Sequence, residues 1–288
     1  MSRCSNCPRK CKADREVFGG ICGVGNESKL ARAGLHFGEE PCVSGKNGSG
    51  TIFFSGCSLR CVFCQNFNIS HEGFGKTVSD ERFVEILKEL EAQGAENNNF
   101  VTPTHYFDRI EGILSNYRPK IPLICNTSGY ELVSNIEKDI FDVYLFDLKF
   151  FSGEKSERYA SCADYFDIAS KALRKAVELK GKPTFDEKGR ITSGVIVRHL
   201  ILPQNTNESI AIIESIKDIA PYIVFSLMSQ YVPMYKASEF KELNRGITKR
   251  EYNKVIDKCL EADFFDVYTQ SFSSATKEMI PCFDLSGV

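Results

Sequence analysis

The sequence has almost no net charge and no long apolar run. Its 36 Lys and Arg residues are set against 38 Asp and Glu, which gives a formal net charge of -2. This balance provides no general attraction to phosphate backbones or anionic lipids, so we expect no nucleic-acid partner and no membrane partner. No stretch approaches the roughly 20 apolar residues that cross a bilayer, and residues 1–12 are polar, unlike the apolar core of a signal peptide. The sequence therefore predicts a cytoplasmic protein.

Cysteine, by contrast, is abundant. The 288 residues include 12 cysteines, in a chain far longer than the small secreted proteins that depend on disulfides. Eight of them precede residue 65, and this crowding favours metal or cluster ligation. The other four are scattered, and we expect them to be small buried apolar side chains: Cys125, Cys162, Cys259 and Cys282.

The chain divides into two regions by pattern. Residues 1–50 are rich in Gly, Cys and charge without periodicity, which predicts a small metal-binding module at 1–50 held by its ligands. From residue 51 to 288, short apolar runs alternate with amphipathic stretches, which predicts β-α units on a parallel sheet, curled into a full or partial barrel or left open. The expected strands cover 51–54, 100–101, 122–125, 142–149, 195–202, 223–228 and 264–268, and the expected helices 79–92, 108–116, 165–179, 205–219 and 248–261. Asn205 with Glu208, and Thr248 with Glu251, are interpreted as N-terminal helix caps.

Polar residues follow almost every predicted strand. In a parallel barrel the carboxyl ends of the strands carry the chemistry, so these residues predict a site at that end. They are Cys57, Thr102, Thr104, His105, Asn126, Thr127, Ser128, Asp147, Lys149, Ser229, Gln230, Gln270 and Ser271.

The most specific motif is the loop after the first of these strands. Cys57, Cys61 and Cys64 are spaced C-x3-C-x2-C, and three thiolates on one loop can surround one metal centre. A closed [4Fe-4S] cluster or structural zinc site normally has four ligands, so three cysteines leave one iron of a cluster open to a small molecule. The alternative is a zinc loop with a fourth ligand from elsewhere, for which Cys42 and His71 are candidates.

This loop, with Phe63 directly before its third cysteine, resembles the cluster loop of the radical S-adenosylmethionine (SAM) superfamily. The segments 50–57 and 147–149 more narrowly resemble relatives of pyruvate formate-lyase activating enzyme. Residues 40–45 and 102–106, and the pattern Cys4-x2-Cys7-Pro8-Arg9-x-Cys11, resemble an iron-sulfur branch of those relatives.

The resemblance implies a partial (β/α)6 TIM-like barrel with a [4Fe-4S] cluster at its mouth. It further implies that the cluster binds SAM, reduces it, and yields methionine and a 5'-deoxyadenosyl radical that takes hydrogen from a substrate. A protein glycine is one candidate target, as for the activating enzymes, and a peptide or small metabolite is another. Flavodoxin or ferredoxin is the expected type of electron donor. From a different class, a non-catalytic protein that carries a cluster or zinc and binds a partner is the alternative.

The resemblance also implies SAM contacts, and these match the relatives unevenly. Thr104 lies where the activating enzymes have a Gly-Gly-Glu motif, and Asn126 where they have an Asp. Asp147 and Lys149 match well and, being two apart on a strand, share a face; a structural ion pair is their alternative role. Arg198 matches an arginine that contacts SAM, and within an aliphatic run it needs an anion, which Asp147 would supply as well as SAM would.

Two histidines and four further cysteines complete the predictions. We interpret His199 as a packing residue, and His105 as either a proton donor or substrate contact or a hydrogen-bonding residue of the fold. The N-terminal cysteines predict a closed site for zinc or a second iron-sulfur cluster, with Cys42 able to replace one ligand. These four are Cys4, Cys7, Cys11 and Cys22.

Overall fold

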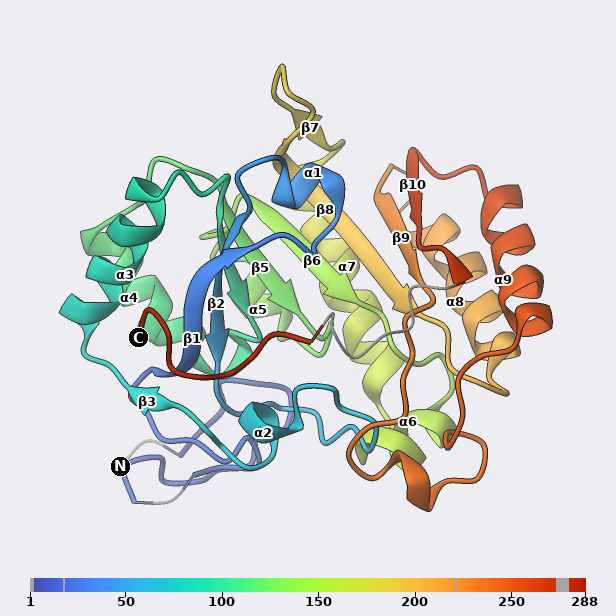
Figure 1. Cartoon of the computed structure of the whole chain (residues 1–288). Coiled ribbons are helices and arrows are strands. Elements are labelled where there is room, and N and C mark those ends of the chain that lie inside the picture. Colours follow the sequence, from blue (N-terminus) through green and yellow to red (C-terminus); the bar gives the residue numbers. More distant parts are fainter. Residues whose placement is uncertain (1–2, 18, 221, 273–279) are drawn as a thin grey trace.

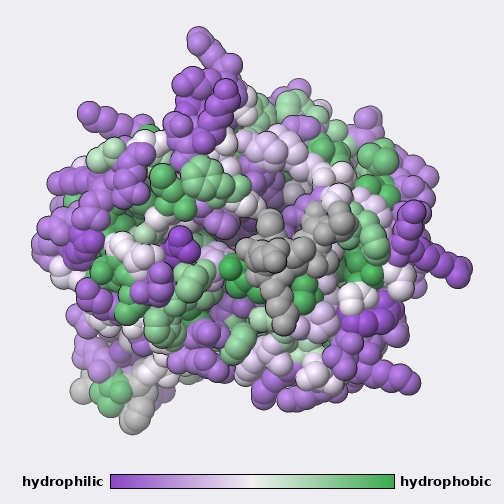
Figure 2. Space-filling model, viewed as in Figure 1, coloured by the Kyte–Doolittle hydropathy of each residue, from purple (hydrophilic) through white to green (hydrophobic). Residues whose placement is uncertain are grey.

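The computed structural model describes residues 3–17, 19–220, 222–272 and 280–288 (Figure 1). Among these residues, no helix is both long and apolar enough to cross a membrane. Figure 2 shows hydrophilic side chains over most of the periphery of one face, with apolar side chains scattered between them.

A single curved sheet forms the centre of the molecule. In the described part of the chain, the strand order is β10-β9-β8-β6-β5-β4-β2-β1-β3, and the run from β2 to β10 is parallel. The parallel strands are β2 (Ser49–Phe54), β4 (Asn98–Val101), β5 (Leu123–Thr127), β6 (Val143–Asp147), β8 (Ile191–Leu200), β9 (Val224–Met228) and β10 (Asp266–Thr269). The sheet is open, because β2 and β10 lie at opposite ends of this run. The predicted α/β fold, a partial barrel, is confirmed, with a seventh parallel strand, β10, beyond the six that the resemblance implies.

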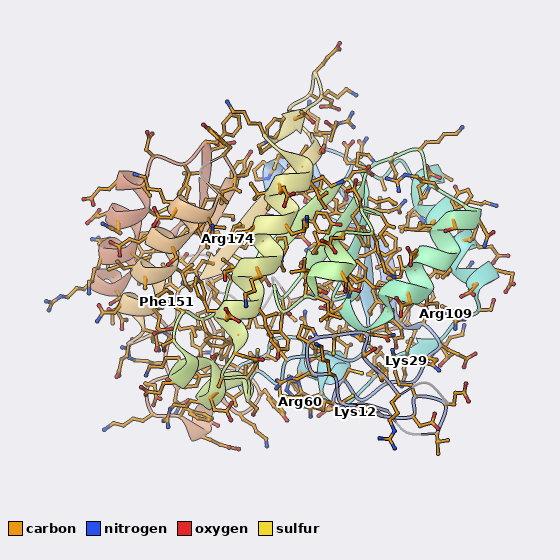
Figure 3. All side chains as sticks on the ribbon, turned by 180° about the vertical axis from the view of Figure 1, so that it is seen from behind. Lys12, Lys29, Arg60, Arg109, Phe151 and Arg174 are labelled. Carbon is orange, nitrogen blue, oxygen red and sulfur yellow. The ribbon has the colours of Figure 1, made fainter. Side chains whose placement is uncertain are left out.

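Helices cover the outside of the sheet, as β-α units require. Figure 1 places α3 and α4 over one end of the sheet and α8 and α9 over the other, and α7, which carries Arg174 in Figure 3, runs along the back. The longer helices are α3 (Asp80–Ala92), α4 (Phe107–Asn116), α6 (Gly153–Ala160), α7 (Tyr165–Lys180), α8 (Thr206–Ile219) and α9 (Lys249–Glu261). The short ones are α1 (Pro41–Ser44), α2 (Phe67–Ser70), α5 (Val133–Ile136), η1 (Thr104–Tyr106) and η2 (Ala237–Glu239).

Alternation along β6 separates the inside of the barrel from the outside. Val143 and Leu145 belong to the small apolar cluster inside, whereas Tyr144 and Phe146 pack with the large core beneath the helices. Because side chains alternate with a period of two, Asp147 continues the inward-facing series. The same alternation along β8 puts Ile196 inside, so Arg198 also faces inward.

The barrel includes more of the N-terminal region than we expected. β1 (Lys29–His36) pairs antiparallel with β2 and with β3 (Lys76–Thr77), so the sheet begins well before residue 51. The short helix α1 follows β1, and its Cys42 and Val43 pack inside the barrel with residues of β5, β6, β8 and β9. We call residues 38–45 the plug. Of the described residues before β1, 3–17 and 19–28 form an irregular cysteine-rich module. This boundary differs from the predicted one at residue 50, because the pairing of β1 with β2 is visible only in three dimensions.

The plug and the cysteine loop lie at opposite ends of the barrel. In Figure 1, α1 sits at the amino end of the parallel strands, and α2, which follows the cysteine loop, sits at their carboxyl end. The C-terminal residues cross the front of β1, where Leu285 N donates to Ala31 O at 3.1 Å and Ala33 N to Ser286 O at 2.9 Å.

The two predicted caps had different outcomes. Thr248 and Glu251 form a complete capping box at the start of α9, as predicted. Asn205 does lie at the N-cap position of α8, as predicted, but its side chain makes no capping bond and donates instead to Pro203 O at 2.7 Å. Glu208 is not a capping partner either, since it accepts hydrogen bonds from the backbone of Phe151 and Ser152, both at 2.9 Å.

Candidate active site

A cavity of about 230 Å³ lies at the carboxyl ends of the parallel strands, as the polar strand ends predict. The cysteine loop forms one side of it through Cys57, Cys61 and Cys64, and the strand ends form the other. Its polar lining from the strands comprises Thr102, Asn126, Thr127, Ser128, Asp147, Lys149, Arg198 and Gln230. A larger cavity, of about 460 Å³, lies between the N-terminal module and the start of α4, but its described lining contains none of the three loop cysteines.

The three loop cysteines share one environment. Burial raises the pKa of Cys57 to about 12 and also raises the pKa values of Cys61 and Cys64, partly offset at Cys64 by the Ser70 hydroxyl 3.2 Å away. Such thiols stay protonated until a cation binds, and metal coordination removes the proton. Three soft donors on one loop fit an iron-sulfur group better than a hard cation.

Metal ligation at these residues stays a prediction. Within the described ranges, no group of three or more Cys, His, Asp and Glu side chains is placed to hold one metal ion. Of the two candidates for a fourth zinc ligand, His71 lines the same cavity, with its Nδ1 2.8 Å from Ser70 Oγ. Cys42 does not, because it lies inside the barrel among Ile124, Val143 and Leu145.

Arg198 is the centre of an inward-facing polar network. Its Nε donates to Asp147 Oδ1 at 2.6 Å, its NH1 to Glu39 Oε2 at 2.7 Å, and its NH2 to Asn126 Oδ1 at 2.8 Å. Lys149 Nζ donates to the other oxygen of Asp147 at 3.0 Å. The expectation that Arg198 needs an anion is confirmed, and the chain itself provides two. Arg198 therefore holds Asp147 and Asn126 in place at the cavity wall.

The charges in this network stabilise one another. Burial raises the pKa of Asp147, but Arg198 and Lys149 outweigh that effect and hold the pKa at about 2. Burial lowers the pKa of Lys149, but the Asp147 carboxylate keeps it above its ordinary value. The group at the cavity wall is thus a carboxylate between two cations at neutral pH. Lys149 uses one of its three donors on Asp147, which leaves others for a ligand.

Thr104 does not reach the cavity. It is fully buried in η1, and its hydroxyl donates to Glu131, whose Oε1 also accepts from Thr127 Oγ1 at 2.6 Å. Burial raises the pKa of Glu131 to about 7, against the hydrogen bonds from Thr104, Thr127 and Asn135. Thr104 is therefore not placed to contact SAM as predicted. Its hydroxyl instead holds the buried carboxyl of Glu131, which the sequence analysis did not identify.

The surroundings of Phe63, His199 and His105 follow from their contacts. Phe63 lines the cavity, and its ring packs edge-on against Phe150 and Tyr231, with centroids 6.0 Å apart in both cases. His199 is a satisfied packing residue, as predicted, since its Nδ1 lies 2.7 Å from Leu148 O and its Nε2 2.8 Å from Ser209 Oγ. His105 is buried away from the cavity, with its Nε2 2.9 Å from Ser55 O, which supports the role in the fold.

The N-terminal module packs directly against the cysteine loop. Cys57 N donates to Cys22 O at 3.3 Å, and Arg9 Nε donates to Ser58 O at 2.8 Å. Gly56 has φ +84°, and a Cβ atom there would lie 2.6 Å from Cys22 O, so only glycine allows this approach. Within the module, a Cβ on Gly20 would lie 2.8 Å from Cys11 Sγ and 3.8 Å from Cys22 Sγ, so these two thiols are neighbours.

The scattered cysteines mostly match expectation. Cys125, Cys162 and Cys259 are buried, but Cys282 is exposed, because it lies on the C-terminal segment outside the sheet.

Sequence reasoning missed Glu39 and Glu40 of the plug. Both side chains are less than a tenth exposed and face Arg198. Glu39 Oε1 also accepts from Asn99 Nδ2 at 3.2 Å and from Asn126 Nδ2 at 3.3 Å. The available signal was a pair of carboxylates directly before Pro41 in a chain with a buried, strand-borne arginine, but nothing in the spacing joins the two.

Comparison with known proteins places the chain in a family. No protein-family model matches it. The uncharacterised protein MJ0674 of Methanocaldococcus jannaschii is 34% identical over 269 residues, which cover 89% of this chain and 74% of that protein. The chain belongs to the MJ0674 family.

Two solved structures are similar to the chain at low sequence identity. The FeFe-hydrogenase maturase HydG from Carboxydothermus hydrogenoformans aligns with a TM-score of 0.49 and 10% identity over 80% of this chain and 56% of that one. The structure of anSMEcpe with bound AdoMet and Cp18Cys peptide aligns with a TM-score of 0.44 and 15% identity over 74% of this chain and 60% of that one. The chain thus spans a little over half the length of these two proteins. Its fold class follows from its own strand order.

Proposed function

We propose that the chain is a radical SAM enzyme that cleaves SAM reductively at a [4Fe-4S] cluster and takes hydrogen from a substrate. One observation carries the proposal: Cys57, Cys61 and Cys64 line the same cavity as Asp147, Lys149 and Arg198. The three thiols would hold the cluster. When bound, it would supply the electron that breaks a carbon-sulfur bond of SAM to give methionine and a 5'-deoxyadenosyl radical.

The strand residues bind and orient in this proposal. Lys149, with free donors, attracts the carboxylate of an amino acid, and Asp147, which accepts from both Arg198 and Lys149, orients the Lys149 ammonium group. Arg198 acts mainly through others, because three of its five N–H donors hold Asp147, Glu39 and Asn126. Phe63 and Tyr231 provide apolar wall and limit the access of water to the cavity.

The electron would come from another protein. Arg60 belongs to the cysteine loop, and both it and the exposed Lys12 lie at the same end of the molecule (Figure 3). Positive charge at this end suits an acidic donor such as a flavodoxin or ferredoxin, because complementary charge speeds encounter. The substrate would supply a C-H bond from a protein glycine, a peptide or a small metabolite.

An assay for 5'-deoxyadenosine tests the proposal. We expect the chain, reconstituted anaerobically with iron and sulfide and then reduced, to form 5'-deoxyadenosine from SAM. A variant with Cys57, Cys61 and Cys64 all changed to Ala should form none, whereas Cys282→Ala, which removes an exposed cysteine, should match the wild type. Product formation by the triple variant would reject the cluster assignment. Iron binding by the wild type without SAM binding would instead favour the non-catalytic cluster protein.

A second variant separates SAM binding from cluster binding. Lys149→Met should weaken SAM binding at least tenfold in equilibrium dialysis, while the visible absorbance of the reconstituted cluster stays unchanged. Lys188→Met, at an exposed position, is the matched control. Equal loss of absorbance and SAM binding in Lys149→Met would mean that Lys149 supports the cysteine loop.

We also propose that Cys4, Cys7, Cys11 and Cys22 hold zinc or a second iron-sulfur cluster. The proximity of Cys11 and Cys22 supports this, as does the hydrogen bond of Cys4 N to Ala13 O at 3.0 Å, which brings Cys4 beside the Cys11 turn. Metal analysis of the Cys57, Cys61, Cys64 triple variant decides between them. About four irons per chain indicate a second cluster, one zinc indicates a structural site, and neither metal rejects the N-terminal site.

A further inference from the structure

A second cavity adjoins the one at the cysteine loop. Its volume is about 260 Å³, just below the usual range for small-molecule sites, which suits a small ligand or one side chain. It lies between the plug and the strands β8 to β10. The two cavities share the lining residues Asn66, Val101, Asn126, Arg198, Met228 and Gln230.

Glu40 brings a carboxyl group to this cavity without a full partner. Its side chain is 7% exposed, and its Oε2 atom is buried with no hydrogen-bond partner among the described residues. The Arg198 NH1 atom lies 4.0 Å from Oε2, which is beyond hydrogen-bond reach. Burial and the neighbouring Glu39 raise the pKa of the Glu40 carboxyl, against Arg198 and a hydrogen bond from the Ser226 hydroxyl. The carboxylate form is therefore costly in this position unless a further cation pairs with it.

Arg198 contributes charge near Glu40 but no hydrogen bond to it. Three of its five N–H groups donate to Asp147, Glu39 and Asn126 at 2.6 to 2.8 Å. In this arrangement its NH1 atom stays 4.0 Å from Glu40 Oε2. The Glu40 carboxyl can therefore accept a hydrogen bond from a further donor.

The rest of the lining adds no positive charge. Among the residues that line this cavity in the described chain, Arg198 is the one Lys or Arg, and two carboxyl groups, Glu39 and Glu40, face it. The polar groups on the other side are neutral: Ser226, Gln230, Tyr268, Thr269 and Gln270. An anionic ligand would meet two carboxyl groups here, whereas a cationic ligand would meet the Glu40 Oε2 atom, which has no hydrogen-bond donor among the described residues.

We propose that this cavity binds the substrate through an organic cation, an ammonium or guanidinium group, with Glu40 as its partner. The proposal rests on the proposed function, because the shared wall brings the ligand next to the SAM site. Glu40 supplies the charge-assisted hydrogen bond, and the neutral side chains around it receive the remaining donors of the cation.

Binding of small probes tests this without turnover. The probes are n-butylammonium, n-butylguanidinium, butyrate and n-butanol, titrated calorimetrically into the purified full chain. We expect at least one cation to bind at least tenfold more tightly than butyrate and butanol, and the preferred cation identifies which group the cavity takes. Glu40→Gln should lower the affinity for that cation at least tenfold, and Glu27→Gln, at an exposed position, should leave it unchanged. Glu40→Asp keeps the charge on a shorter side chain and should retain the preference for cations over butyrate.

Three results would overturn the proposal. They are equal binding of butyrate and the cations, full cation affinity in Glu40→Gln, and an equal loss of SAM and cation affinity in that variant, which would put Glu40 in the SAM site. The 5'-deoxyadenosine assay on the same preparations separates the two proposals. SAM cleavage without cation binding rejects this one alone, and Glu40-dependent cation binding without SAM cleavage rejects the proposed function alone.

Discussion

Glu39 and Arg198, 159 residues apart in the chain, form an ion pair of 2.7 Å inside the barrel. The pair connects the plug to β8, and through Arg198 to Asp147 on β6 and Asn126 on β5. The amino end of the barrel and the candidate active site are thus parts of one hydrogen-bonded network. A substitution in the plug should therefore alter the positions of Asp147 and Asn126 at the cavity wall.

Removal of Glu39 should destabilise the whole protein. In Glu39→Ala, the buried guanidinium of Arg198 loses one of its two close carboxylates, and breaking a buried pair costs about 3 kcal/mol or more. We expect a loss of about 3 kcal/mol in the free energy of unfolding, measured by urea denaturation. Glu85→Ala removes a 63% exposed partner of Arg82 and should change stability by less than about 0.5 kcal/mol. Similar small losses in both variants would mean that the pair does not anchor the plug.

Glu131 should make stability depend on pH. Burial raises the pKa of this carboxyl from 4.5 to about 7, so the folded chain keeps its proton at pH values where the unfolded chain has lost it. The contribution is favourable below about pH 4.5 and is lost as pH rises to about 7, by on the order of 3 kcal/mol.

Urea denaturation between pH 5 and 8 measures this effect. The wild type should lose stability across the window relative to Glu131→Gln, whose amide does not titrate but can still accept from Thr104 and Thr127. Glu187→Gln, at an exposed position, should follow the wild type. Parallel stability curves for the wild type and Glu131→Gln would show that the carboxyl is ionised in the folded state throughout.

Gly56 should tolerate no side chain. An Ala there would place its Cβ 2.6 Å from Cys22 O in a left-handed backbone conformation, and we expect a loss of about 1 to 3 kcal/mol. The contact with the N-terminal module should open, so that limited proteolysis cuts within residues 3–25. Gly112→Ala lies in α4 with no atom near its Cβ, and should gain about 0.5 to 1 kcal/mol. Protease resistance of Gly56→Ala equal to that of Gly112→Ala would contradict the close approach.

Thr248 should stabilise α9 as its N-cap. Thr248→Ala removes the bond from Glu251 N to Thr248 Oγ1 at 3.2 Å, and should lower the free energy of unfolding by about 1 kcal/mol. Ser115→Ala, at an exposed position near the end of α4, should stay within about 0.5 kcal/mol of the wild type in the same urea titration. If the two variants were equally stable, the capping box would contribute nothing.

Local patterns predicted the elements that depend on neighbouring residues. Thr248 was predicted as a cap and does cap α9, and the periodic apolar positions of 79–92 do form α3. The inward face of β6 could be derived as well, because Asp147 follows Val143 and Leu145 in steps of two. The loop of Cys57, Cys61 and Cys64 directly follows the predicted strand 51–54. That position alone placed the loop correctly at the carboxyl end of the strands.

Contacts between distant segments could not be predicted from the sequence. Thr104 and Asn205 have the right side chains for a ligand contact and a cap, yet each finds another partner in three dimensions. Cys42 belongs by sequence to the cysteine-rich region, but its side chain packs among apolar residues inside the barrel. The carboxylates before Pro41 did not identify the partner of Glu39, because Arg198 lies on a strand that only the folded sheet brings near.

The position of the plug also sets an order of events during synthesis. A ribosome adds about 5 to 20 residues per second, so Arg198 follows Glu39 by on the order of 10 to 30 s. For that time the plug has no barrel to enter, and Cys42 and Val43 remain without the strands that bury them in the finished protein. The amino end of the barrel can therefore close only late, as a long-range step that follows the local helices and hairpins.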